Sequence, residues 1–233
     1  MVAAPTLLLF DVDGTLVAGA AQAHARALRA ALYEVHGIDA EAVRSAVSPA
    51  GRTEGEIARA LLVAAGVSAL RIDDRADDVR EACCEQYARL CPADLSDKVI
   101  AGIPALLREL RERSDIKLSL VTGNYEPVGR LKLARAGLGH FFASGQGGFG
   151  SDAEDRAMLP AIARRRAGAD GVAFARGQTI VIGDTPRDIY CARADGVRCL
   201  AVATGPYDAE QLQDADGVAD GSEQLRDLIA AHL

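Results

Sequence analysis

The stretch that most constrains the fold of this chain lies near its start, where an apolar run ends in two closely spaced carboxylates. Residues 7–10 read Leu-Leu-Leu-Phe, and Asp11-Val12-Asp13-Gly14-Thr15 follows directly. A short apolar run bounded by turn residues is typical of a buried strand in a parallel sheet. Asp11 and Asp13 then lie at the carboxyl end of that strand, where open α/β sheets bind ligands, and their side chains point the same way.

Two carboxylates on one side of a strand end repel each other unless a cation lies between them or one of them holds a proton. Mg²⁺ suits such a place because it prefers oxygen ligands and keeps coordination positions open for phosphate. An ordinary strand followed by a turn is the alternative, because Asp and Gly are both common in turns. The pair Asp11 and Asp13 is therefore a candidate site whose interpretation depends on the rest of the chain.

The pattern of an apolar run followed by polar residues occurs twice more. Residues 117–121 end at Thr122-Gly123-Asn124, and residues 179–182 end at Gly183-Asp184, with Asp188 four residues further on. The carboxyl ends of parallel strands share one edge of a sheet, so these polar ends can converge although they are far apart in sequence. Each of them alone also fits an ordinary helix N-terminus, which Thr, Asn and Asp favour. Their recurrence favours a shared site.

Two kinds of pattern divide the chain. Residues 16–95 contain no second convincing strand and predict successive helices at 20–36, 39–47, 53–65 and 73–90. From about residue 100, strands and helices alternate, which indicates a parallel sheet with helices on both faces. We therefore predict an α/β fold with a Rossmann-like, doubly wound parallel-sheet core, formed by residues 1–16 and 99–233. A helical-bundle cap domain, residues 17–98, is inserted after the first strand.

The alternating part of the chain gives a definite set of expected elements. Helices are expected at 103–113, 127–136, 157–167, 186–194 and 224–231. Strands are expected at 117–121, 141–144, 179–182, 198–203 and near Val218. The glycine-rich segment 146–150 is expected to be a loop.

Composition excludes several classes of partner. The chain has 233 residues, 49% of them hydrophobic, and a formal net charge of -7, with no long run of Lys and Arg. An acidic chain of this kind argues against nucleic acid and anionic membranes as partners. Its five cysteines are odd in number and include no C-x-x-C, which indicates free thiols in a reducing compartment. With no basic leader and no apolar window of about 18 residues, the protein is expected to be soluble and cytoplasmic.

Three of these segments carry a resemblance to a known family. Asp11-Val12-Asp13-Gly14-Thr15 resembles the first motif of the haloacid dehalogenase superfamily, most of whose members are Mg²⁺-dependent phosphatases. Thr122-Gly123-Asn124 resembles the second motif, and Gly183-Asp184-Thr185-Pro186-Arg187-Asp188 resembles the fourth. The resemblance implies the phosphatase branch with a helical cap of the C1 type, similar to phosphoglycolate phosphatases and β-phosphoglucomutases.

The third motif is where the sequence departs from the family. The superfamily usually places a lysine there, but the three lysines of this chain, Lys98, Lys117 and Lys132, all precede position 133. Arg156 is the candidate, because it follows the glycine-rich segment and opens a helix. Its planar guanidinium would change the geometry of the contact. An ordinary exposed arginine is the alternative.

The resemblance also implies a mechanism. Asp11 would attack phosphorus in line and form an aspartyl-phosphate, and Asp13 would protonate the leaving oxygen and then activate water. Mg²⁺ would be held by Asp11, the main-chain carbonyl of Asp13 and Asp184, with Asp188 binding the metal directly or orienting its waters. The phosphate oxygens would be held by Thr122, Gly123, Asn124 and Arg156.

Two further residues of the expected cap each have two alternative surroundings. Arg52, in the loop 48–53, could reach the substrate or be solvated. His24 could face the site or solvent, and solvent is favoured. Many relatives have an acidic residue and a serine where this chain has Ala18-Gly19, so the sequence indicates no particular substrate subgroup.

Asp13 favours a phosphate substrate, because the carbon-attacking dehalogenase branch usually has no acid at this place. The absence of lysine before Lys98 argues against the phosphonate-cleaving branch, which uses a cap lysine. We expect a phosphatase acting on a small phosphorylated metabolite, as a monomer or homodimer. A phosphosugar mutase of the β-phosphoglucomutase kind is the alternative within enzymes. A non-enzymatic phospho-acceptor is disfavoured, because receivers carry their aspartate after the third strand.

Overall fold

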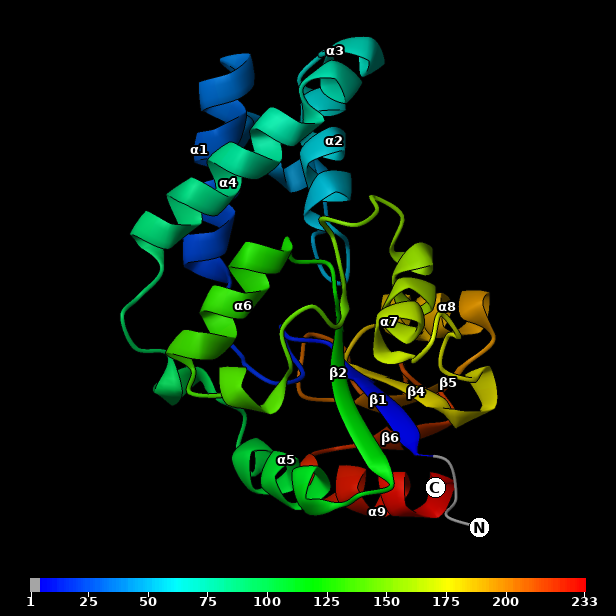
Figure 1. Ribbon diagram of the computed structural model, residues 1–233. Helices are drawn as coiled ribbons and strands as arrows, with labels where there is room; N and C mark the ends of the chain where they lie inside the picture. Colours follow the sequence, from blue (N-terminus) through cyan, green and yellow to red (C-terminus); the bar gives the residue numbers. More distant parts are fainter. Residues whose placement is uncertain (1–4) are drawn as a thin grey trace.

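The computed structural model describes residues 5–233, and its centre is a six-stranded parallel sheet (Figure 1). The order of the strands across the sheet is β3-β2-β1-β4-β5-β6. Their bounds are β1 Thr6–Phe10, β2 Ile116–Thr122, β3 Gly148–Phe149, β4 Thr179–Gly183, β5 Arg198–Val202 and β6 Gly217–Ala219. The predicted α/β fold with a doubly wound parallel sheet is confirmed.

Helices cover both faces of the sheet (Figure 1). On one face lie α5 (Ile103–Glu112) and α9 (Ser222–His232), and on the other lie α7 (Leu159–Ala167) and α8 (Pro186–Asp195). The central strand β1 is buried along its whole length, and its side chains alternate between the two cores. Leu8 and Phe10 pack with α5 and α9, whereas Leu7 and Leu9 pack with α7 and α8. Because alternate side chains of β1 enter two different hydrophobic cores, every residue of the strand interior must be apolar.

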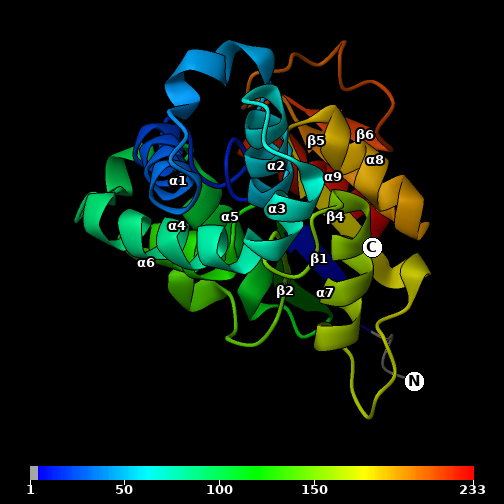
Figure 2. The same ribbon diagram turned by 90° about the horizontal axis from the view of Figure 1, so that it is seen from above.

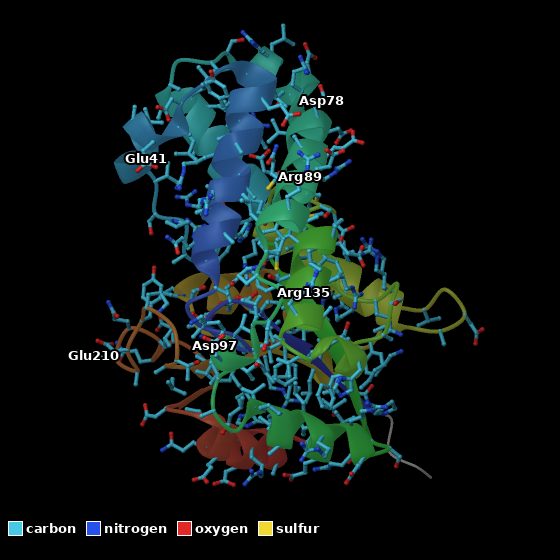
Figure 3. The ribbon with its side chains drawn as sticks, turned by 90° about the vertical axis from the view of Figure 1, so that its left-hand side faces the viewer. Glu41, Asp78, Arg89, Asp97, Arg135 and Glu210 are labelled. Atoms are coloured by element: carbon cyan, nitrogen blue, oxygen red, sulfur yellow. The ribbon has the colours of Figure 1, made fainter. Side chains whose placement is uncertain are left out.

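A separate layer of helices lies beyond the carboxyl ends of the strands (Figures 1 and 2). We call it the helical layer; it consists of α1 (Ala21–His36), a 3₁₀ helix (Ala40–Ala46), α2 (Glu54–Ala64), α3 (Ala69–Asp74) and α4 (Ala76–Leu90). It has a hydrophobic core of its own, centred on α1 and α4, which includes Leu28, Leu32 and Tyr87. Charged side chains such as Asp78 and Arg89 project from its outer surface (Figure 3).

Helix α6 (Glu126–Arg135) connects the two cores. Tyr125 and Val128 belong to the core of the helical layer, whereas Leu133 and Ala136 pack into the core beneath the sheet. The loop between β2 and α6 therefore lies between the sheet and the helical layer.

The strand order creates a crevice at one defined place. From β1 the chain goes to β2 and β3 on one side, and then returns to β4 on the other side of β1. Neighbouring strands whose connections leave in opposite directions open a crevice at their carboxyl ends. Asp11 follows β1 and Asp184 follows β4, so both lie at this crevice, which is the topological switch point of the sheet.

Several predicted elements differ from the structure. The strand expected at 141–144 is wrong: residues 139–141 form a 3₁₀ helix, and the edge strand is Gly148–Phe149, inside the segment expected to be a loop. A side chain at position 148 would overlap the carbonyl of Leu159, so the glycine that suggested a loop is what lets the strand pack there.

In the helical layer, the helix expected at 73–90 is two helices. The first begins after Ser68, whose hydroxyl accepts from the Arg71 amide, and the break lies at Arg75. The segment expected as a helix at 39–47 is a 3₁₀ helix, and the other predicted helices end within three residues of their expected bounds.

Within residues 5–233, no helix has both the length and the apolar character needed to cross a membrane. The five cysteines are free, as the sequence predicts.

Candidate active site

Three carboxylates meet at the switch point of the sheet. Asp11, Asp184 and Asp188 are 4%, 1% and 0% exposed, and one oxygen from each lies within 4.8 Å of the others. The Asp11 amide donates to the carbonyl of Ile182 at 2.8 Å, which extends the pairing of β1 with β4 by one residue. Among the described residues, Oδ1 of Asp11 has no hydrogen-bond partner. The predicted convergence of strands β1 and β4 therefore produces a compact, buried acidic cluster.

Two glycines leave the space that the Asp184 carboxylate occupies. Gly14 has a φ of +82°, which disfavours other residues, and a side chain here or at Gly205 would overlap the Asp184 carboxylate. Thr15 donates from its hydroxyl to Oδ1 of Asp184 at 3.1 Å. Thr204 donates to the carbonyl of Gly14 at 2.6 Å and so joins the loop after β5 to the loop after β1. Gly14 of the D-x-D-G-T motif therefore leaves space for the carboxylate of Asp184, which follows β4.

Burial and mutual repulsion raise the pKa values of two carboxylates of the cluster, Asp11 and Asp184. Burial raises the pKa of Asp11 to about 7; Arg156 opposes this shift, while Asp188 and Asp13 add to it. Burial, together with Asp11 and Asp188, raises the pKa of Asp184 to about 8. Groups that resist ionisation in this way favour a bound cation, which would neutralise them.

Arg156 is buried beside this cluster, not exposed. It is 4% exposed, pairs with Asp188, and places its Nη2 3.4 Å from Oδ1 of Asp11. Asp188 also caps α8, because its Oδ2 accepts from the Thr185 amide at 3.0 Å and from the Thr185 hydroxyl at 2.7 Å. Both oxygens of Asp188 therefore already have partners, which makes Asp11 and Asp184 the more available metal ligands.

Asp13 belongs to a different group of contacts. Lys132 of α6 is completely buried, and its Nζ lies 2.7 Å from Oδ1 and 2.6 Å from Oδ2 of Asp13. Asn124 donates to Oδ2 of Asp13 at 2.9 Å and to the hydroxyl of Thr122 at 2.8 Å. Burial would raise the pKa of Asp13, but Lys132, His24 and these hydrogen bonds together lower it. The side chain of Asp13 thus lies outside the acidic triad.

Sequence reasoning missed Lys132, although it contacts a predicted site residue. From the sequence, Lys132 is relevant only as a replacement for the third-motif lysine, for which it comes too early in the chain. The signal available in the sequence was a lysine flanked by two leucines within a predicted helix. Such a lysine can be buried only if it is paired, which indicates a charged partner nearby.

The second-motif loop contacts the helical layer directly. A side chain at Gly123 would overlap the carbonyl of Arg52, and the Glu54 amide donates to the Gly123 carbonyl at 2.9 Å. In return, Oε2 of Glu54 accepts from the Tyr125 amide at 2.9 Å. The N-terminus of α2 therefore docks on the loop between β2 and α6 through a main-chain hydrogen bond to Gly123 and a hydrogen bond from the Tyr125 amide to the Glu54 side chain.

His24 does not face solvent, which corrects the favoured expectation. Its side chain is 16% exposed and its Nε2 contacts Oε1 of the buried Glu54. Burial and Lys132 lower the pKa of His24 to about 3, against the influence of Asp13. Burial raises the pKa of Glu54 to about 8. The pair is therefore neutral at pH 7, and the protonated carboxyl can donate to the imidazole.

A cavity of about 480 Å³ lies between the sheet edge and the helical layer. Every predicted site residue except Asp188 lines it: Asp11, Asp13, Arg52, Thr122, Gly123, Asn124, Arg156 and Asp184. Arg52 reaches this wall while paired with Glu56 and donating to the Ser48 carbonyl at 3.0 Å. Much of the remaining lining is small and apolar, including Val17, Ala20 and Ile57. The volume suits a small ligand.

Comparison with known families identifies the chain. A sequence model of haloacid dehalogenase-like hydrolases matches residues 5–196, well over half of the sequence. This chain belongs to the haloacid dehalogenase-like hydrolase family. The match includes the first, second and fourth motifs at the carboxyl ends of β1, β2 and β4. A search of curated proteins finds no match.

Solved structures of other members of this hydrolase family share the fold. A haloacid dehalogenase-like hydrolase from Streptococcus pneumoniae has a TM-score of 0.64 at 23% identity, over 97% of this chain and 98% of that one. A β-phosphoglucomutase from Clostridium difficile has a TM-score of 0.67 at 18% identity, over 98% and 96%. A predicted phosphoglycolate phosphatase from Haemophilus somnus has a TM-score of 0.62 at 17% identity, over all of both chains.

The acidic cluster of this hydrolase fits a divalent cation, which haloacid dehalogenase-like enzymes generally use. Three buried carboxylates supply only oxygen donors, and Oδ1 of Asp11 has no hydrogen-bond partner among the described residues. The raised pKa values of Asp11 and Asp184 show that a positive charge would be favoured beside them. Nothing in this donor set resembles the nitrogen or sulfur ligands of a zinc site.

Proposed function

We propose that this hydrolase is a Mg²⁺-dependent phosphatase that acts on a small phosphomonoester through an aspartyl-phosphate. The observation that carries this proposal is Asp11. It is buried at the switch point, its Oδ1 accepts no hydrogen bond among the described residues, and it lines the cavity. A carboxylate held in this way is available as a nucleophile.

The two chemical steps assign separate roles to the two carboxylates of the first motif. An oxygen of Asp11 forms a bond to phosphorus while the bond to the leaving oxygen breaks, and Asp13 gives that oxygen its proton. Asp13 enters this step in its protonated form, which the negative charge of a bound phosphate favours against the influence of Lys132. Asp13 then takes a proton from water, which attacks phosphorus, releases phosphate and regenerates Asp11. The different contacts of Asp11 and Asp13 support this division, because one lies in the acidic triad and the other against Lys132.

Mg²⁺, when bound, would neutralise the carboxylates and the phosphate and so stabilise the charge that develops in phosphoryl transfer. We assign Asp11, Asp184 and the main-chain carbonyl of Asp13 as its ligands, with Asp188 orienting waters. Asp188 already accepts from Thr185 and pairs with Arg156, which supports an indirect role for its side chain. The triad supports a cation here, and magnesium is our choice within the oxygen-binding metals.

Arg156 and the second-motif loop are proposed to hold the phosphate oxygens. The guanidinium of Arg156 lies beside Asp11, where the transferred phosphoryl group would be bound. Thr122 offers its hydroxyl, and Gly123 and Asn124 offer main-chain amides next to the start of α6, a place where anions bind well. Arg52 is proposed to contact the part of the substrate that projects toward the helical layer.

The helical layer is proposed to act as a cap domain, residues 17–98, over a core of residues 1–16 and 99–233, of which 1–4 lie outside the described residues. Its own hydrophobic core and its docking through α2 support this division. Closure of such a cap excludes water from the site. We further propose a cytoplasmic protein, because its cysteines are free.

The direct test is release of phosphate from p-nitrophenyl phosphate with and without Mg²⁺. We expect activity that depends on the metal and that falls by at least about 1000-fold in Asp11→Asn, because no nucleophile remains. Asp227→Asn, an exposed aspartate on α9, is the matched control and should retain full activity. An Asp11→Asn variant that keeps most of its activity would show that the nucleophile is another group.

A substrate panel then separates the phosphatase from a mutase. A phosphatase releases inorganic phosphate from several small monoesters. A mutase instead converts glucose 1-phosphate to its 6-phosphate isomer and needs a bisphosphate activator. Isomer formed without net phosphate release would favour the mutase.

A further inference from the structure

Among the described residues, Lys132 is the one lysine that is fully buried, and its charged end lies at the candidate site. Its ammonium group makes three contacts: two with the carboxylate of Asp13 and one with Oδ1 of Asn124 at 2.9 Å. Burial of an ammonium group is costly unless charged or polar partners surround it. All three contacts lie at the edge of the candidate site, and none lies in the apolar core around α6.

These contacts fix the orientation of Asp13. Lys132 approaches both carboxylate oxygens from α6, while the side-chain amide of Asn124 donates to one of them and is itself anchored by Thr122. The carboxylate is therefore held by three hydrogen bonds from two donor groups, Lys132 and Asn124. Its side chain remains 36% exposed, and Asp13 also lines the cavity. One side of the carboxylate is clamped while the other faces the space where a substrate would bind.

Lys132 and Arg156 divide the cationic contacts between the two carboxylates of the first motif. Arg156 lies beside Asp11 and pairs with Asp188, whereas the contacts of Lys132 are with Asp13 and Asn124. The positive charge of Lys132 therefore acts on Asp13, the proposed acid–base residue, whereas Arg156 lies beside Asp11, the proposed nucleophile.

We infer that Lys132 is a positioning residue, which holds Asp13 in the orientation that lets it exchange a proton with the leaving group of the substrate. This inference rests on the proposed phosphatase function and adds to it a residue outside the four family motifs. Lys132 acts through Asp13 and does not touch the substrate. Lys132 contacts Asp13 where water would otherwise do so, and it thereby keeps the Asp13 side chain in one rotamer.

Leaving-group dependence provides a measurement that a purely structural role would not change. The value of kcat/KM is measured for p-nitrophenyl, phenyl and ethyl phosphate, in order of rising pKa of the leaving alcohol. A p-nitrophenolate leaves without a proton, whereas an alkoxide needs one from Asp13. We expect Lys132→Met to lower kcat/KM by about 100-fold or more for ethyl phosphate and only by about threefold for p-nitrophenyl phosphate.

Two further variants control for folding. Lys117→Met is the matched control, because Lys117 is a half-buried lysine on β2 that donates to the Ala167 carbonyl at 2.7 Å, and it should leave the leaving-group dependence unchanged. Lys132→Met combined with Asp13→Asn removes both charges of the pair, so no buried charge is left alone. If Lys132 acts only through Asp13, this double variant should match Asp13→Asn in kcat/KM to within about twofold.

The outcomes separate the two proposals. A wild-type protein that hydrolyses the three esters, with a steeper leaving-group dependence in Lys132→Met, supports both. Equal losses for all three esters, or a further loss in the double variant beyond Asp13→Asn, overturn the role of Lys132 but leave the phosphatase intact. A wild-type protein that hydrolyses none of the esters overturns both.

Discussion

At the scale of single residues, the least expected feature is a buried carboxyl group in the helical layer. Glu54 is 1% exposed, lies at the start of α2, and has a pKa raised to about 8 by burial. The Tyr125 amide and Lys132 oppose this shift only in part. Glu54 therefore carries a proton in the folded protein at neutral pH but loses it in the unfolded chain, where its pKa is near 4.5.

This difference makes stability fall as the pH rises. Between pH 4.5 and 8 the folded state binds a proton at Glu54 that the unfolded state does not bind, so unfolding becomes easier through this window. Glu54→Gln keeps an acceptor for the Tyr125 amide and cannot ionise. We expect the variant to gain free energy of unfolding over wild type by on the order of 1 kcal/mol per pH unit in this window.

Urea unfolding of both proteins at pH 5.5, 7 and 8, without metal, measures this gain. The comparison within each pH cancels the contributions of Asp11 and Asp184, which both proteins share. A constant difference between variant and wild type across the three pH values would mean that Glu54 is ionised in the folded protein.

At the scale of elements, the contact between α2 and the loop that follows β2 joins the helical layer to the site. The main chain of residues 52–54 lies against Gly123, and Thr53 donates to the Glu154 carbonyl at 2.5 Å. One segment of the helical layer therefore contacts both the second-motif loop and the segment that leads to Arg156. Its position sets one wall of the cavity.

Gly123→Ala should disrupt this docking without unfolding the protein. The added methyl group would overlap the Arg52 carbonyl, which is main chain and cannot rotate away, so the two segments must separate. We expect kcat/KM to fall by at least about 10-fold, because a displacement near 1 Å at a site is costly. Gly177→Ala is the control, since nothing lies within 4 Å of the added methyl group. Equal activity of the two variants would show that the contact is dispensable.

At the scale of the whole molecule, the acidic cluster connects metal binding to stability. Asp11 follows β1, whereas Asp184 follows β4, so a cation bound by both would tie these two strand ends together. Such a cation binds the folded chain far better than the unfolded one, in which the carboxylates are dispersed.

Mg²⁺ should therefore stabilise the protein in a way that depends on Asp184. At a concentration 100 times its Kd, a ligand that binds only the folded state adds about 2.7 kcal/mol, which in a chain of this size raises Tm by roughly 5–10 °C. Asp184→Asn should abolish this shift. Thermal melts with EDTA and with increasing Mg²⁺ measure it, and an equal shift in Asp184→Asn would place the metal elsewhere.

Local patterns in the sequence were enough to predict the parallel sheet and most of its helices. Apolar runs ending in polar residues located β1, β2 and β4, because a central parallel strand must be apolar on both faces. The edge strand at Gly148–Phe149 was missed, because an edge strand of two residues leaves no periodic signal. The residues predicted for the site do line one cavity, apart from Asp188, but their chemical roles remain predictions.

The sequence by itself determined which residues lie at the carboxyl ends of the strands, because strand ends are set by neighbours within a few positions. The pairing of Lys132 with Asp13, and of His24 with Glu54, joins residues 119 and 30 positions apart, and no local pattern encodes such distances. These contacts form only when α6 and the helical layer pack against the sheet and exclude water. Burial then decides which ionisable groups keep their charge, and burial is a property of the tertiary structure alone.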